Sequence, residues 1–335
     1  MPMKMLITGA AGFIGYHLAL KLLNNGNKVC GVDNFNNYYS TELKEDRAAL
    51  LEKHENFCMY RVNIANKAEL RDVFRKFKPD IVINLAAQAG VRYSIENPDA
   101  YAESNLTGFL NVLECCCKSQ QMPSLLFASS SSVYGGITEM PFSEDMKVDS
   151  PISLYAATKK SNELMAHSYS HLYGMQTLGY RFFTVYGPWG RPDMAYFSFA
   201  NRLIDGKPIK VYNKGDMYRD FTFIDDVVDG LERSIQNLSS LPQYAIYNIG
   251  NNNSEKLMDM IDILASELNI KNPILELLPM QPGDVYATYA SVEKLKAAVG
   301  YNPKTSLKDG LRHFCKWFKD WRTRKQSAGT GPAKR

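Results

Sequence analysis

The chain of 335 residues has few cysteines, little net charge and no long apolar run. Its six cysteines lack the spacing of a secreted disulfide framework, so a reducing compartment, the cytoplasm, is expected. Three of them are consecutive, at 115–117, and cannot share one helix face, so no metal site is expected. A net charge of +4 argues against a general nucleic-acid partner. Without a segment long enough to cross a bilayer, no membrane association is expected either.

The composition is that of an ordinary globular protein, with 45% hydrophobic and 22% charged residues. The length suffices for one large α/β unit and a smaller second part, each with a buried core. Residues 323–335 instead combine Gly, Ser, Ala and Pro with basic residues. This composition predicts a disordered tail.

The first half alternates short apolar runs with amphipathic segments. The apolar runs predict strands at 4–8, 28–32, 58–62, 81–85 and 124–129, and the segments between them predict helices at 16–24, 67–77 and 101–118. This alternation is typical of a parallel sheet covered by helices on both faces. Because such crossovers are right-handed, the expected fold is α/β with a doubly wound Rossmann sheet.

The second half is less regular. It predicts a helix at 155–173, a strand at 176–183, a Gly/Pro-rich loop at 187–192 and a helix at 254–268. We expect a Rossmann domain at 1–180 and a smaller mixed α/β substrate-binding domain at 181–322. No flexible spacer separates the two, so a cleft between them is expected.

Glycines follow the first predicted strand and open the first predicted helix. In this strand–turn–helix context, Gly9, Gly12 and Gly15 predict a dinucleotide site, because glycine permits a tight turn and close approach to a pyrophosphate. The second strand ends beside Asp33, which is suited to the ribose hydroxyls of the adenosine. Its charge would repel a 2′-phosphate and no arginine follows at 34–37, so the pattern favours NAD over NADP.

A catalytic pattern follows further along the chain. Tyr155 and Lys159 lie four residues apart, on one face of the predicted helix. An ammonium near the phenol would lower the pKa of the tyrosine and make it a usable base. The fifth predicted strand ends in Ser129, Ser130, Ser131 and Ser132, and ligands bind at the carboxyl ends of strands in this fold. These hydroxyls could bind a sugar.

Together these motifs resemble the extended short-chain dehydrogenase/reductase family, also described as NAD-dependent epimerases and dehydratases. Longer stretches resemble UDP-glucuronate 4-epimerases: residues 84–94 (NLAAQAGVRYS), 181–188 (RFFTVYGP), 190–194 (GRPDM), 219–222 (RDFT) and 278–285 (LPMQPGDV). The similarity extends from about residue 4 to 320. It implies an isomerase that uses NAD to invert C4 of UDP-glucuronate through a 4-keto intermediate, giving UDP-galacturonate for polysaccharide biosynthesis.

The resemblance also implies the role of each site residue. Tyr155 would be the base, Lys159 its electrostatic partner, and Ser130 the hydroxyl at the sugar O4. The cofactor would contact Gly9, Gly12, Phe13, Ile14, Gly15, Asp33, Asn34, Asn63, Ile64, Leu85, Ala86, Ala87, Gln88, Asn105, Ser129, Tyr155, Lys159 and Phe182. The substrate would contact Arg92, Ser130, Ser131, Ser132, Tyr155, Thr184, Arg191, Val211, Tyr212, Arg219 and Asp284, with Arg191 and Arg219 on the diphosphate.

The choice of sugar depends on three hydroxyl residues. A 4-keto glucuronate can lose carbon dioxide unless its carboxylate is held out of alignment with the carbonyl. Ser131, Ser132 and Thr184 could hold it. Related decarboxylases and dehydratases resemble this chain but have carboxylates at the serine positions, so the pattern disfavours both reactions.

Two alternatives stay open from the sequence. UDP-glucose 4-epimerases usually have Asn at the position of Thr184 and Arg at that of Gln281, but they are otherwise similar. A non-catalytic NAD-sensing protein could share the fold, although it would need no proton acceptor. Apolar stripes at 104–117 and 155–171, helices that family members pair, imply a homodimer.

Overall fold

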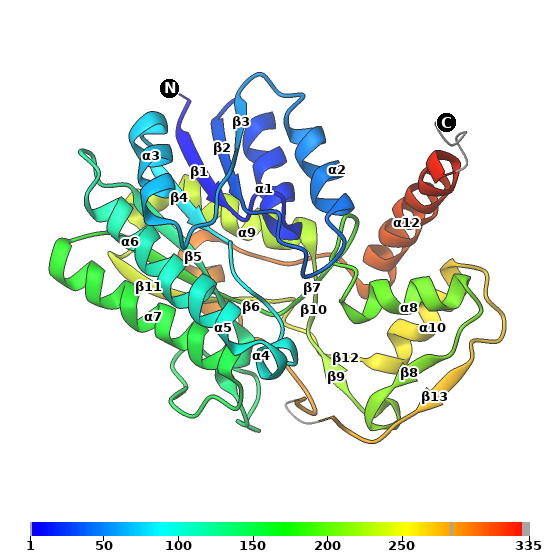
Figure 1. Ribbon diagram of the computed structural model, residues 1–335. Helices are drawn as coiled ribbons and strands as arrows, with labels where there is room; N and C mark the ends of the chain where they lie inside the picture. The colour runs from blue at the N-terminus through cyan, green and yellow to red at the C-terminus, as the bar shows by residue number, and fades with distance from the viewer. Residues whose placement is uncertain (1, 282–283, 330–335) are drawn as a thin grey trace.

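The computed structural model describes residues 2–281 and 284–329, and its main feature is a parallel sheet (Figure 1). The seven strands lie in the order β11-β6-β5-β4-β1-β2-β3. Their bounds are β1 Lys4–Thr8, β2 Lys28–Asp33, β3 Phe57–Arg61, β4 Ile81–Asn84, β5 Ser124–Ser130, β6 Thr177–Phe182 and β11 Tyr244–Ile249. All adjacent pairs in this sheet are parallel, and the strand order reverses between β1 and β4. This is the doubly wound Rossmann arrangement that the sequence predicts.

Helices cover both faces of the sheet (Figure 1). One face packs α3 (Lys67–Phe77), α6 (Phe109–Cys117) and α7 (Leu154–Tyr173) over a core that includes Leu6, Val82 and Phe127. The other face packs α1 (Phe13–Asn24), α2 (Glu42–Leu51) and α9 (Ile224–Gln236) over a larger core that continues into the smaller part of the molecule. Strands buried on both faces explain the continuous apolar runs of the sequence.

The smaller part lies beyond the carboxyl ends of the strands (Figure 1). Short strands pair there as β7 with β10, β8 with β13 and β9 with β12. The bounds are β7 Thr184–Tyr186, β8 Ile209–Val211, β9 Tyr218–Arg219, β10 Phe221–Phe223, β12 Glu255–Lys256, β13 Leu275–Leu277, α8 Ala195–Ile204, α10 Leu257–Glu267, α11 Glu293–Val299 and α12 Leu307–Gly329. The expected division at residue 180 falls within β6, and β11 and α9 return to the large sheet from the later sequence. The domain boundaries therefore remain a proposal.

The first six strands lie within one residue of their predicted ends. Two of the predicted helices differ from the prediction. The helix expected at 101–118 is divided into α5 (Pro98–Tyr101), a π-helical stretch at Ala102–Gly108 and α6. The helix expected at 254–268 begins only at Leu257, because Glu255–Lys256 pairs with β9 instead. The described part of the chain contains no helix long and apolar enough to cross a membrane.

The predicted disordered tail is wrong for residues 323–329, which continue helix α12. The aromatic residues Phe314, Trp317, Phe318 and Trp321 pack the preceding turns against the core. Lys325 then forms ion pairs with acidic side chains of α2 at 3.3 and 3.8 Å. Adding turns to a helix whose earlier turns are already packed costs little free energy. The composition of residues 323–329 does not reveal this, because it depends on the packing of the turns before them. The rest of the predicted tail, 330–335, lies outside the described residues.

Candidate active site

A cavity of about 860 Å³ lies at the carboxyl ends of the strands, between the large sheet and the smaller part. It spans the point where the strand order reverses, which is where ligands bind in doubly wound folds. Among the described residues, seven Lys or Arg side chains line it but only three Asp side chains do. Such a cavity suits a large ligand with several negative charges.

The glycine loop between β1 and α1 forms one wall of this cavity. Gly9 adopts a left-handed φ of +72°, and a Cβ on Gly15 would lie 2.1 Å from the carbonyl oxygen of Gly9. Glycine is therefore required at both positions by the turn itself. Helix α1 begins after Gly12 with no side-chain cap and no acidic residue in its first turn. Its N-terminal N–H groups and dipole thus favour an anion in the cavity.

Asp33 lies at the end of β2 and lines the same cavity. Its carboxylate accepts hydrogen bonds from the backbone N–H groups of Ala11 (3.1 Å) and Phe35 (2.9 Å). Lys44 of α2 approaches it to 3.9 Å and donates to the carbonyl and side-chain oxygens of Asn36. The carboxylate therefore fixes the glycine loop as well as facing the cavity. Lys44 escaped prediction, because the pattern that favours NAD covers only residues 34–37.

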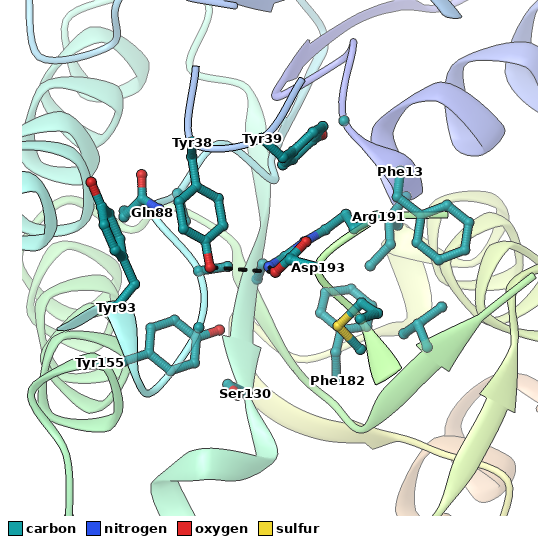
Figure 2. Close-up of a pocket in the computed structure, with 18 of the residues that line it drawn as sticks. Phe13, Tyr38, Tyr39, Gln88, Tyr93, Ser130, Tyr155, Phe182, Arg191 and Asp193 are labelled. Carbon is teal, nitrogen blue, oxygen red and sulfur yellow. Dashed lines mark hydrogen bonds and ion pairs between the residues drawn. The ribbon is translucent and has the colours of Figure 1, made fainter. Parts of the chain in front are cut away.

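The reacting groups predicted from the sequence lie together. Tyr155 and Lys159 share one face of α7, and Figure 2 shows Tyr155 beside Ser130 in the cavity wall. Burial raises the pKa of Tyr155, while the Ser130 hydroxyl and the charge of Arg191 lower it. Burial also lowers the pKa of Lys159 to about 8, and its ammonium donates to the Ala128 carbonyl at 2.9 Å. Ser130 and Arg191 thus favour the phenolate in this structure. The effect of Lys159 on Tyr155, predicted from their spacing, stays a prediction.

A buried ion pair between Glu163 and Arg181 lies next to the helix and the strand that carry these groups. Glu163, on the same face of α7 as Tyr155 and Lys159, accepts from Arg181 of β6 at 2.8 and 2.9 Å. It also accepts from Ser129 at 2.6 Å. Arg181 donates further to the hydroxyl of Tyr134, at 3.1 Å. The network joins α7 to the ends of β5 and β6, so it fixes the strand that ends in the serines relative to the helix that carries Tyr155.

The π-helical stretch carries Asn105, which braces the cavity wall at Gln88. Its side chain accepts from the backbone N–H of Gln88 (2.8 Å) and donates to the carbonyl of the same residue (3.0 Å). It also donates to the hydroxyl of Thr158, which in turn donates to the carbonyl of Tyr155. Asn105 itself is buried and does not line the cavity. The structure thus gives it a supporting position beside Gln88.

Arg191 reaches the cavity from the loop after β7. It forks onto Asp193, at 3.0 and 2.5 Å, and the hydroxyl of Tyr38 reaches the same carboxylate at 3.4 Å (Figure 2). Figure 2 shows Arg191 in the same part of the cavity as Tyr155 and Ser130, and its charge lowers the pKa of Tyr155. Tyr38 comes from the loop after β2, so this contact spans the cleft.

A second cationic cluster, which contains Arg92 and Arg219, also lines the cavity. Arg92 forms an ion pair with Asp284 at 2.9 Å, and its guanidinium lies 5.2 Å from the ring centre of Tyr212. Burial lowers the pKa of Arg219, and Asp284 opposes that shift. An aromatic ring beside two arginines can stack a nucleobase and bind a diphosphate. Pro282 and Gly283 of the adjacent motif lie outside the described residues.

Most of the predicted site residues line this one cavity; the exceptions are Asn105 and Val211. Val211 is fully buried at the end of β8 and precedes Tyr212, which does line the cavity. Sequence reasoning missed several lining residues: Tyr38, Tyr39, Lys44, Tyr93, Asp193, Ser198, Phe199, Arg202, Lys210, Met217, Phe221 and Leu257. Tyr93, Asp193 and Phe221 lie within quoted motifs, but the others lie in segments that carried no recognisable pattern.

Comparison with known proteins agrees with this geometry. The model of the NAD-dependent epimerase/dehydratase family matches residues 5–250. The chain is 48% identical to Protein CapI of Staphylococcus aureus, over 95% of this chain and 99% of that one. It is 42% identical to a probable UDP-glucuronate 4-epimerase of Rhizobium meliloti, over 94% and 97%. The crystal structure of UDP-glucuronic acid 4-epimerase from Bacillus cereus with UDP-glucuronic acid and NAD superposes with a TM-score of 0.89, at 33% identity over 95% and 100% of the two chains.

Proposed function

This chain belongs to the NAD-dependent epimerase/dehydratase family, and we propose that it is an isomerase that interconverts UDP-glucuronate and UDP-galacturonate by inverting C4. The observation that carries this proposal is one cavity containing Ser130, Tyr155 and Lys159 together with Ser131, Ser132 and Thr184. The relatives named for this activity, and the superposition on one of them in complex with UDP-glucuronic acid and NAD, support it.

The cofactor is NAD, and the residues present fit it. The glycine loop and the uncapped N-terminus of α1 would hold the pyrophosphate, and Asp33 would hold the adenosine ribose. Leu85 to Gln88, braced by Asn105, would form the wall beside the nicotinamide half. Lys159 would donate to the nicotinamide ribose. When bound, NAD supplies the acceptor for the C4 hydride and later the hydride that returns.

The chain's own residues then control the proton and the position of the sugar. Tyr155 accepts the O4 proton while Ser130 holds that oxygen by a hydrogen bond. The Arg191 charge, the Ser130 hydroxyl and the cationic nicotinamide all favour the phenolate, which offsets the effect of burial on the Tyr155 pKa. The resulting 4-keto sugar turns over in the cavity and presents its other face. Tyr155 then returns the proton to O4.

The hydroxyl groups explain why the 4-keto acid survives. Ser131 and Thr184 both line the cavity just after the neighbouring strands β5 and β6, and both can donate to a carboxylate without supplying a charge. Residues 131 and 132 are serines, where the related decarboxylases and dehydratases have carboxylates. The acid or base that decarboxylation or elimination of water would need is therefore missing at these two positions. A neutral hydroxymethyl group would use these donors less well, which favours glucuronate over the alternative UDP-glucose.

The nucleotide would occupy the other end of the cavity. Tyr212 would pack the uracil, Arg219 would bind the diphosphate, and Asp284 would accept from a ribose hydroxyl. Arg92, which pairs with Asp284 in this structure, would join that contact. Arg191, also predicted for the diphosphate, lowers the pKa of Tyr155 by its charge, which supports a contact with the sugar as well.

We further propose a cytoplasmic homodimer, with an NAD-binding domain at 1–180 and a nucleotide-sugar domain at 181–322. Leu110 of α6 and Leu164 and Leu172 of α7 expose 39%, 58% and 68% of their surface, and a two-fold pairing of these helices would bury them. The cytoplasm supplies both NAD and UDP-sugars. The dimer predicts twice the chain mass in light scattering at micromolar concentration.

The proposal is tested by incubating the purified protein with UDP-glucuronate, UDP-glucose and UDP-xylose in separate reactions. We expect UDP-galacturonate from the first, identified by NMR, and much slower conversion of the other two. Preference for UDP-glucose would support the alternative substrate instead. Bound NAD with no turnover of any sugar would support a non-catalytic NAD-binding role.

A further inference from the structure

Arg47 of helix α2 is fully buried, and it forms no ion pair with any carboxylate of the described residues. Its guanidinium meets only neutral oxygens. Nε and Nη2 donate to the carbonyl of Trp189 (3.1 and 2.5 Å), and Nη2 also donates to that of Gly190 (3.0 Å). Nη1 donates to the carbonyl of Ala11 (2.9 Å) and the hydroxyl of Tyr39 (3.2 Å).

Burying a cation without a partner costs several kcal/mol, and an apolar side chain in the same place is often more stable. Four neutral acceptors offset only part of that cost. Those acceptors come from three segments: the glycine loop, the loop after β2, and the loop at 187–191. The residue therefore joins the cofactor side of the cavity to the segment that carries Arg191.

The backbone of the 187–191 loop has an unusual conformation, which the hydrogen bonds from Arg47 would stabilise. Trp189 adopts a positive φ of 60°, which is unusual for a residue with a side chain. A Cβ on Gly190 would lie 1.7 Å from the Tyr196 hydroxyl, so no other residue fits there. The carbonyl of Pro188 meets the ring of His17 at 2.9 Å. Burial lowers the pKa of His17 to about 4, so this ring is neutral at physiological pH. Three successive carbonyls thus turn towards α1 and α2, and Arg191 follows directly.

We propose that Arg47 is a positioning residue, which holds the 187–191 loop against the glycine loop so that Arg191 faces the substrate while NAD is bound. Its positive charge also lies beside the loop that binds the pyrophosphate, where it favours the anion. It touches neither ligand, and it acts on the substrate through Arg191. The inference rests on the proposed function for the identity of that substrate.

The test is a double-mutant cycle in a Tyr155→Phe background, in which substrate binds without turnover. Calorimetry measures UDP-glucuronate binding to the NAD-saturated background protein and to its Arg47→Met, Arg191→Met and doubly substituted variants. We expect each single substitution to weaken binding by about tenfold or more. The double variant should be no more than about twofold weaker than Arg191→Met alone, because Arg47 acts through Arg191. Arg61→Met is the matched control, since Arg61 contacts α2 through Glu45 but is exposed.

A merely structural role predicts a different pattern. Arg47→Met would then lower the unfolding temperature while leaving the affinity for UDP-glucuronate unchanged. Alternatively, the losses of affinity caused by Arg47→Met and Arg191→Met would multiply in the double variant. Either result overturns the proposal. If Arg47→Met does not fold, Arg47→Lys enters the same cycle, because it keeps the charge but loses the fork. Failure of the Tyr155→Phe protein itself to bind UDP-glucuronate would count against the proposed function instead. The proposal about Arg47 would then be decided by NAD affinity, which Arg47→Met should reduce by about tenfold and Arg61→Met should not.

Discussion

Thr184→Val tests how the sugar carboxylate is held. Thr184 lies on β7, lines the cavity, and its backbone N–H donates to the Asp220 carbonyl at 3.1 Å. Among the described residues, its hydroxyl has no hydrogen-bond partner in the protein. Valine keeps the shape and the β-branch, so the folded protein should lose little stability. The effect of the substitution should appear only when a ligand needs that hydroxyl.

The magnitude follows from the charge of the ligand. A hydrogen bond to a charged group contributes about 1.5–3 kcal/mol, which corresponds to a loss of about 10- to 140-fold in affinity. UDP has no carboxylate, so its binding should not change. Calorimetry with UDP-glucuronate and UDP, on Tyr155→Phe protein with and without Thr184→Val, measures both. Thr184→Ser is the control that restores the hydroxyl and should restore the affinity.

The same substitution should also make the enzyme release a decarboxylated side product. A looser carboxylate can rotate into alignment with the C4 carbonyl, so Thr184→Val with Tyr155 intact should leak a UDP-4-keto-pentose or UDP-pentose. Mass spectrometry detects the loss of carbon dioxide directly. Equal weakening of UDP and UDP-glucuronate, or normal epimerisation without leakage, would refute this placement of the carboxylate.

Four further predictions follow from other parts of the site. Tyr155→Phe should lower turnover by about 10²–10⁴-fold in an NMR assay while substrate binding persists; unchanged turnover would remove the tyrosine from the mechanism. Because burial lowers the pKa of Lys159 from 10.5 to about 8, the unfolded chain binds more protons between these values, and stability should rise with pH across that window; urea titrations should show that Lys159→Met loses this rise. Glu163→Gln leaves the buried Arg181 charge unpaired and should cost about 3–5 kcal/mol in urea unfolding, so a loss below 1 kcal/mol would contradict the assigned role of the pair. Asp33 should exclude NADP, so NADP should fail to displace NAD at equal concentration in a fluorescence competition, and comparable affinities would overturn that assignment.

The sequence predicts the sheet well because its strands are buried on both faces. Runs such as Met5–Ile7 and Ile81–Ile83 are apolar throughout, and glycine or a polar residue ends them at the ligand side. The residues that line the cavity cluster at the carboxyl ends of the strands. The glycine motif after the first strand and the four-residue spacing of Tyr155 and Lys159 therefore locate most of the site.

Helix α2 shows why the rest escaped prediction. Its buried face carries Lys44 and Arg47 beside Leu43, Ala48 and Leu51, so the apolar period of an amphipathic helix is broken. Lys44 donates to Asn36 in the loop before the helix, and Arg47 donates to carbonyls of distant segments, which no local pattern records. The same holds for the π-helical stretch around Asn105, where the sequence reads as one continuous helix.

The most direct test of the proposed mechanism uses UDP-glucuronate that carries deuterium at C4. The C4 hydrogen should leave as hydride and return to the opposite face of the same sugar, without reaching water. NMR and mass spectrometry should therefore find UDP-galacturonate that retains the deuterium at C4 and takes up none from deuterated solvent in a matched unlabelled reaction. Loss of the C4 label to solvent, or a product that has lost carbon dioxide, would contradict a hydride held between NAD and a sugar positioned by Tyr155, Ser130 and Thr184.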